Sequence, residues 1–197
     1  GIDAYLVVVP YYNKPTQEGL FLHFTAIADA VPKPVILYNV PGRTVADLLP
    51  ETVGRLAAHG NIIGIKEACG SLEQISDVIR FCPEDFILLS GDDFTSMPTA
   101  LIGGKGVISV ISNVDPAGMA RMIEAAMNGN LQVANEEHYR LFTMMKLMFK
   151  SPSPGPAKKA LEMLGRIQDG SPRLPMTPAD EQTRQALAEE MSRLGML

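Results

Sequence analysis

Residues 61–68 read Asn61-Ile62-Ile63-Gly64-Ile65-Lys66-Glu67-Ala68, a short apolar run that ends in a lysine and a glutamate. A segment with helical spacing precedes this run over Pro50–Ala58, and another follows it over Leu72–Phe81. A strand that is apolar on both faces is typical of a parallel sheet covered by helices. The stretch and its flanks therefore predict an α/β fold.

Similar apolar runs recur along the first 110 residues. The predicted strands are Tyr5–Val9, Val35–Val40, Ile62–Ile65, Phe86–Leu89 and Val107–Val110. Segments of helix length lie between them, and the first covers Glu18–Val31. A (β/α)₈ barrel needs eight strands and typically about 250 residues. This pattern alone therefore fits an open sheet as well as part of a barrel.

After Val110 the alternation of strands and helices stops. The helices predicted from here on are Asp115–Asn128, Leu131–Phe149, Ala157–Leu164 and Ala179–Leu194. Six of the eleven methionines lie between Met119 and Met148, at a spacing that suits a helical core or a subunit interface. We therefore predict two parts, an α/β region over residues 1–130 and an all-helical region over residues 131–197.

The composition excludes several classes of protein. The chain carries 17 Lys and Arg against 22 Asp and Glu, a net charge of −5, and it lacks the basic stripe of a nucleic-acid-binding surface. Its apolar runs are too short to span a bilayer, and its start does not resemble a signal peptide, so we expect a cytoplasmic protein. Its cysteines and histidines lie far apart, and their spacing predicts neither a disulfide framework nor a metal site.

Lys66 is the strongest candidate for a catalytic residue. It lies at the carboxyl end of a predicted parallel strand, the edge where α/β folds build their active sites. Strand alternation places its side chain on the same face as Ile62 and Gly64. An apolar face favours the neutral amine, which attacks a ketone to form a Schiff base. The alternative is a strand-end lysine that pairs with a carboxylate such as Glu67.

Other strand ends carry polar side chains as well. Tyr38, inside Val35–Val40, is either a proton donor near the lysine or a core tyrosine. Arg43 follows Gly42 in the next turn, where its guanidinium either grips a substrate carboxylate or stays in solvent. Gly91-Asp92-Asp93, at the end of the fourth strand, either coordinates a cation or caps the next helix, and capping is favoured.

Six segments resemble, in the same order along the chain, the dihydrodipicolinate synthase family of the N-acetylneuraminate lyase superfamily. They are Pro10–Gly19, Leu37–Thr44, Asn61–Ala68, Leu89–Asp93, Gly104–Val110 and Arg173–Met176. The resemblance extends over essentially the whole chain. It implies a (β/α)₈ TIM barrel, of which strands four to eight are present here, followed by an all-helical C-terminal extension.

The resemblance also implies a reaction, the condensation of pyruvate with L-aspartate 4-semialdehyde to 4-hydroxy-tetrahydrodipicolinate. This is a lyase-class step of lysine (diaminopimelate) biosynthesis. Lys66 would form the imine with pyruvate, and Tyr38 would transfer protons at the imine and at the attacked carbonyl. Tyr12 would complete a relay of hydroxyl groups by reaching into the neighbouring subunit's site. Arg43 would hold the carboxylate of the semialdehyde.

Further features follow from the same resemblance. Gly91 and Ile108 would lie at the pyruvate pocket, and Tyr11 would be a remnant of a lysine feedback site. No metal or organic cofactor is implied, because the imine on Lys66 itself withdraws electrons. The family's usual assembly is a homotetramer, built as a dimer of dimers.

The family's barrel begins with three βα units that we do not find in these 197 residues. Those units include a pair of threonines that binds the pyruvate carboxylate. We therefore expect the chain to be N-terminally truncated, and we expect no synthase activity from it alone. Two alternatives stay open. One is another pyruvate-dependent class I aldolase of the superfamily, and the other is an inactive truncated homologue that acts as an interaction partner.

Overall fold

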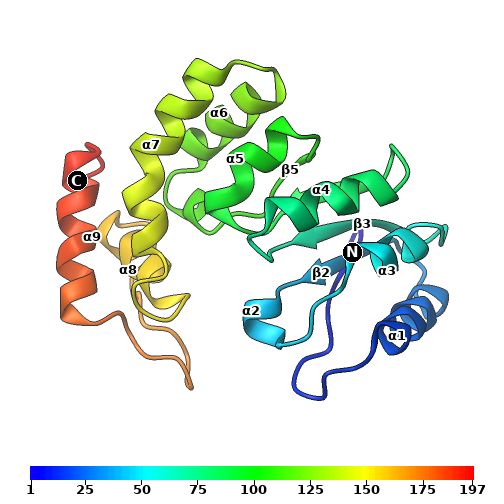
Figure 1. The fold of residues 1–197 in the computed structure, drawn as a ribbon. Coiled ribbons are helices and arrows are strands. Elements are labelled where there is room, and N and C mark those ends of the chain that lie inside the picture. Colours follow the sequence, from blue (N-terminus) through cyan, green and yellow to red (C-terminus); the bar gives the residue numbers. More distant parts are fainter. The chain divides into compact units, whose positions relative to one another are not determined.

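Each strand of the sheet lies beside the strand that follows it in the sequence (Figure 1). In the computed structural model, which describes residues 1–197, the strands are parallel and their order is β1-β2-β3-β4-β5. They are β1 (Tyr5–Val8), β2 (Val35–Asn39), β3 (Ile62–Glu67), β4 (Ile87–Ser90) and β5 (Gly106–Val107). A doubly wound sheet reverses its strand order at a switch point. The unreversed order seen here is that of a (β/α)₈ barrel.

Helices connect these strands. They are α1 (Gln17–Ala30), α2 (Pro41–Thr44), α3 (Pro50–Leu56), α4 (Leu72–Phe81) and α5 (Asp93–Leu101). Three of them begin after a side-chain oxygen that accepts a hydrogen bond from a free backbone N–H: Thr16 for α1, Ser71 for α4 and Asp92 for α5. The segment Gly91-Asp92-Asp93 therefore caps a helix, as predicted.

One face of the sheet is buried under α1, α3 and α4 (Figure 1). The core on this side comprises Val35, Leu37, Ile65 and Leu88 from the sheet and Leu20, Phe24, Val53, Leu56, Ile75 and Val78 from the helices. The opposite face is less covered, and Val8 is 36% exposed there. Val8, Tyr38 and Lys66 are neighbours in one row across the strands, so they share this less covered face.

The structure corrects the predicted alternation in β3. Two consecutive residues of β2 pair with Ile62 and with Gly64, so Ile63 is an extra residue in β3. Such a bulge shifts the alternation of side chains by one position. Ile62 therefore lies in the core on the helix side, opposite to Lys66, whereas simple alternation predicts that the two share a face.

Residues 109–197 form a second compact unit, after a first unit over residues 1–108. The second unit contains a 3₁₀ turn (Ile111–Asn113) and the helices α6 (Pro116–Met127), α7 (Leu131–Leu147), α8 (Gly155–Met163) and α9 (Glu181–Arg193). In it α6 packs on α7, and α9 packs on α7 and α8. Five of the six methionines between Met119 and Met148 are buried, so they fill the core of this unit.

The boundary between the two compact units precedes α6, whereas the sequence places the start of the helical region at residue 131. Within the second unit α6 packs on α7. The predicted start of the helical region at residue 131 stays a prediction. No helix of the chain combines the length and the apolar character needed to cross a membrane.

Candidate active site

Lys66 and Tyr38 lie side by side at the carboxyl ends of β3 and β2. They are partners in the parallel pairing of the two strands, and Lys66 Nζ lies 4.0 Å from the centroid of the Tyr38 ring. Both side chains are half-buried. The structure thus brings together two of the residues that the sequence predicts at strand ends. An amine beside a phenol is an arrangement suited to Schiff-base formation with proton transfer.

Glu67 does not pair with Lys66, because its carboxyl group turns to the helix-covered side of the sheet. It is fully buried, Asn39 Nδ2 donates to both of its oxygens at 3.1 Å, and the backbone N–H of Cys69 donates to Oε1 at 2.9 Å. Burial raises the pKa of Glu67 to about 7, although the hydrogen bonds act to lower it. The ion pair that the sequence left open is therefore not formed.

Arg43 lies in an anchored turn after β2. Its side chain is exposed. Val45, at the end of α2, has a φ of 63°, a left-handed conformation that is strained for a β-branched residue. The buried Thr44 hydroxyl holds the turn, since it lies 3.1 Å from the carbonyl oxygen of Val40 and 2.7 Å from that of Ala46. The position suits a residue that grips a carboxylate, and that role stays a prediction.

Tyr11 and Tyr12 lie in the loop between β1 and α1, and they are 68% and 91% exposed. Tyr12 has a φ of 75°, which is uncommon for a residue other than glycine. At this exposure Tyr12 makes few contacts within its own chain. Its role in a neighbouring subunit's site, and the feedback remnant at Tyr11, both stay predictions.

Gly91 lies directly against the Lys66 side chain. A Cβ atom added at Gly91 would come within 2.8 Å of Ala68 Cβ and 2.9 Å of Lys66 Cε, so the absence of a side chain leaves room for the lysine stem. Ile108 follows β5 at the same carboxyl edge, and its N–H donates to the carbonyl oxygen of Ser90 at 2.8 Å. Both residues are therefore at the predicted edge of the sheet.

The close approach at Gly91 leads to a first prediction. We expect Gly91→Ala to slow Schiff-base formation at Lys66 by about tenfold or more, because the added methyl group displaces the amine and a misplaced reacting group is costly. The rate is measured by trapping the pyruvate adduct with borohydride and quantifying it by mass spectrometry. Gly60→Ala is the matched control, since a Cβ atom there meets nothing within 4 Å. Equal rates in the two variants would contradict the steric argument.

Other candidate chemistry is weaker. No group of three or more His, Cys, Asp or Glu side chains is placed to hold a metal ion. Cys69 and Cys82 are free thiols. Burial raises the pKa of Cys69 to about 12 and that of Cys82 to about 11, so both remain protonated at neutral pH and neither is an activated nucleophile.

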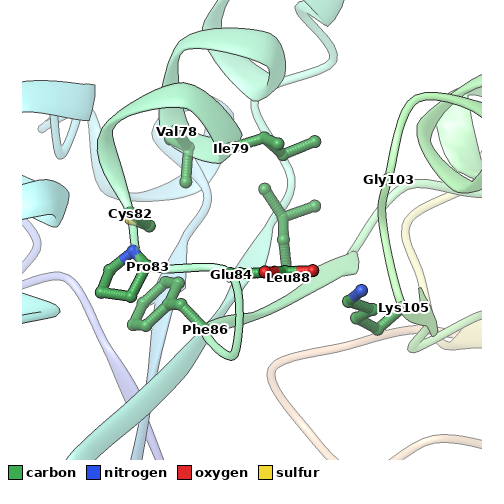
Figure 2. A pocket seen from close by; sticks show the side chains of 9 residues that line it. All are labelled: Val78, Ile79, Cys82, Pro83, Glu84, Phe86, Leu88, Gly103 and Lys105. Atoms are coloured by element: carbon green, nitrogen blue, oxygen red, sulfur yellow. The ribbon is translucent and has the colours of Figure 1, made fainter.

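A cavity of about 340 Å³ lies elsewhere in the first unit (Figure 2). Apolar side chains of Val78, Phe86 and Leu88 line it, with Lys105 to one side. The loops that line it precede β4 and β5, so the cavity lies at the amino ends of these strands. Active sites of barrels are built at the carboxyl ends, and we therefore assign the site to the edge that carries Lys66.

Sequence reasoning missed a group of buried polar residues behind the site. Asn39 is fully buried next to Tyr38, and its Nδ2 donates to Asp47 at 2.7 Å as well as to Glu67. Gln74 of α4 donates to the same Asp47 oxygen at 3.0 Å. A signal was available, because Asn39 and Glu67 are polar residues at strand positions that face an apolar core.

Comparison with known sequences gives matches over the whole chain. The family model described as the dihydrodipicolinate synthetase family matches residues 1–194. The 4-hydroxy-tetrahydrodipicolinate synthase of Desulfotalea psychrophila is 64% identical over 197 residues, which are 100% of this chain and 66% of that protein. The chain thus spans about two thirds of the length of this curated relative.

Solved structures match over the whole chain as well. The chloride-inhibited dihydrodipicolinate synthase of Acinetobacter baumannii, complexed with pyruvate, is 42% identical with a TM-score of 0.96, over 100% of this chain and 67% of that one. A structure described as the first monomeric dihydrodipicolinate synthase variant is 41% identical with a TM-score of 0.97, over the same shares. These similarities confirm the predicted fold, part of a TIM barrel followed by a helical region.

Proposed function

The chain belongs to the dihydrodipicolinate synthetase family, and on that basis we propose that it supplies the active-site lysine of a synthase. The proposed reaction condenses pyruvate with L-aspartate 4-semialdehyde to 4-hydroxy-tetrahydrodipicolinate, in lysine biosynthesis. One observation carries the proposal: the Lys66 amine lies 4.0 Å from the centroid of the Tyr38 ring, at the carboxyl edge of a parallel sheet. Homology to synthases points to the same chemistry.

The proposed reaction begins at the Lys66 amine. Its lone pair attacks the ketone carbon of pyruvate, water leaves, and an imine remains. Loss of a proton from the pyruvate methyl group gives an enamine, whose carbon forms the new C–C bond with the aldehyde. The aldehyde oxygen takes up a proton, and Tyr38 supplies it in this scheme. The amino group of the semialdehyde then attacks the imine carbon, the ring closes, and the bond to Lys66 breaks.

The remaining residues have supporting roles in this proposal. Arg43 holds the carboxylate of the semialdehyde at the entrance, a task that suits its planar guanidinium. Gly91 and Ile108 border the pyruvate pocket, and Tyr12 joins the proton relay of a neighbouring subunit. No metal or organic cofactor takes part, because the protonated imine withdraws the electrons. A homotetrameric assembly and a cytoplasmic location stay predictions.

The test is to trap the imine. The protein that carries this chain, and the 197-residue chain in parallel, are incubated with pyruvate and borohydride and then mapped by mass spectrometry. We expect a reduced pyruvate adduct on Lys66. An adduct on another lysine, or none in either sample, would overturn the proposal. Binding to a larger partner without an adduct would favour the inactive homologue instead.

The aldehyde is tested separately, because imine formation alone does not identify it. We expect turnover with L-aspartate 4-semialdehyde to exceed turnover with sugar-acid aldehydes that lack its amino group. The reverse order would identify another pyruvate-dependent aldolase of the superfamily.

A further inference from the structure

Three polar side chains lie behind Lys66 and Tyr38, on the helix-covered side of the sheet. We call Asn39, Asp47 and Glu67 the Asn39 clasp. Asn39 and Glu67 are fully buried, and they form the register pair next to the pair of Tyr38 and Lys66. The proposed reaction uses none of the three side chains.

The Asn39 amide is hydrogen-bonded at both ends. Its Nδ2 donates to Asp47 Oδ1 at 2.7 Å and to the Glu67 carboxyl group at 3.1 Å. Its Oδ1 accepts from the backbone N–H of Leu48 at 3.0 Å. Asp47 and Leu48 belong to the segment that follows α2. One buried amide therefore ties together β2, β3 and the turn that carries Arg43.

The two carboxyl groups of the clasp extend these connections. Glu67 Oε1 accepts from the backbone N–H of Cys69 at 2.9 Å, which fixes the chain just after β3. Asp47 Oδ1 accepts from Gln74 of α4 at 3.0 Å, and the Asp47 carbonyl accepts from Gln17 of α1 at 2.8 Å. The clasp thus links two strands, one active-site turn and two helices.

We propose that Asn39 and Glu67 are positioning residues, which keep Lys66 aligned with Tyr38 and with the turn of Arg43. This inference rests on the proposed function. The bulge at Ile63 lies three residues before Lys66, and a bulge interrupts the ladder that sets strand register. A slip by one residue would turn Lys66 to the wrong face. A satisfied buried polar group specifies one arrangement, because any other leaves it unpaired.

The clasp also contains a group that titrates near neutral pH. Burial is the main cause that raises the pKa of Glu67 to about 7 from 4.5, and the negative charge of Asp47 adds to it. The titratable groups that face Glu67 are Asp47 and the Cys69 thiol. The folded state binds a proton on Glu67 more tightly than the unfolded state does. Protonation of Glu67 therefore stabilises the fold fully below about pH 4.5, and this stabilisation is lost as the pH rises to about 7.

The test compares Glu67→Gln, Glu67→Leu and Asn39→Leu with the wild type, by the rate of pyruvate imine formation per folded molecule. Gln keeps an oxygen acceptor without the charge, so we expect Glu67→Gln to stay within about threefold of the wild type at pH 6. Both Leu variants leave buried donors unpaired. We expect at least a tenfold loss from each, in the maximal rate more than in the KM for pyruvate.

The pH dependence of the unfolding free energy and a control variant distinguish a positioning role of Asn39 and Glu67 from a role in stability alone. We expect the unfolding free energy of the wild type, relative to Glu67→Gln, to fall between about pH 4.5 and 7. Val78→Ala is the matched control, because Val78 is fully buried in the same core but makes no contact with the clasp through hydrogen bonds. It loses stability and keeps the imine rate per folded molecule.

The outcomes separate the two proposals. Wild-type imine rates in the Leu variants, or an equal slowing in Val78→Ala, would overturn the positioning role while the wild-type adduct on Lys66 still supports the proposed function. If both Leu variants fail to fold, the test rests on Glu67→Gln. A loss of tenfold or more in its rate of imine formation at pH 6 would contradict the proposal, because the proposed role of Glu67 needs only a neutral acceptor. A wild type without any adduct would overturn the proposed function itself.

Discussion

Replacing Lys66 by methionine is expected to abolish the pyruvate adduct and to lower turnover by about 10³-fold or more, the scale seen when a covalent nucleophile is removed. Methionine keeps an unbranched apolar stem, with sulfur in place of Cδ, that fits against Gly91, and it lacks the amine. Turnover by the protein that carries this chain is measured with pyruvate and L-aspartate 4-semialdehyde. The adduct is measured by borohydride trapping.

Two further measurements make the Lys66→Met result specific. The free energy of unfolding is expected to stay within about 1 kcal/mol of the wild type, because Lys66 is only half-buried and its Nζ lies against the face of the Tyr38 ring. Lys105→Met is the same chemical change at an exposed lysine of the first unit, and it is expected to leave turnover unchanged. Retention of the adduct in Lys66→Met would assign the imine to a different lysine.

Local pattern was enough to locate the strands that carry the site. Each predicted run overlaps an observed strand, because a parallel strand covered on both faces in a barrel must be apolar in both alternating positions. The sequence placed Lys66 and Tyr38 at the ends of successive strands and left open whether Tyr38 lies near the lysine. The structure places Lys66 Nζ 4.0 Å from the centroid of the Tyr38 ring.

Non-local contacts were beyond the sequence pattern. The bulge at Ile63 arises from pairing with β2, and a sequence without its partner strand carries no sign of it. Strand order also needed the structure, since the alternation of strands and helices fits both an open sheet and a barrel. The Asn39 clasp was missed because its members lie on three separate segments.

Replacing Tyr38 by phenylalanine is expected to lower turnover by about 10²- to 10⁴-fold, the range in which a positioned proton donor contributes. Phenylalanine keeps the ring over which Lys66 Nζ lies at 4.0 Å, so the amine loses little of its orientation and only the phenol hydroxyl is removed. We therefore expect the KM for pyruvate to change much less than the maximal rate. Steady-state kinetics at several pyruvate concentrations measure both.

The prediction also states which step of the reaction Tyr38→Phe slows. If Tyr38 transfers protons at the reacting atoms, Tyr38→Phe still forms the adduct on Lys66, but more slowly, whereas Lys66→Met forms none. Tyr5→Phe removes a hydroxyl from β1, where Tyr5 packs against the core on the helix side, and it is the matched control with unchanged turnover. If Tyr38→Phe turns over as fast as the wild type, then the Tyr38 hydroxyl does not transfer protons, and water or another hydroxyl group carries them. The ring of Tyr38 would then matter for the placement of the amine alone.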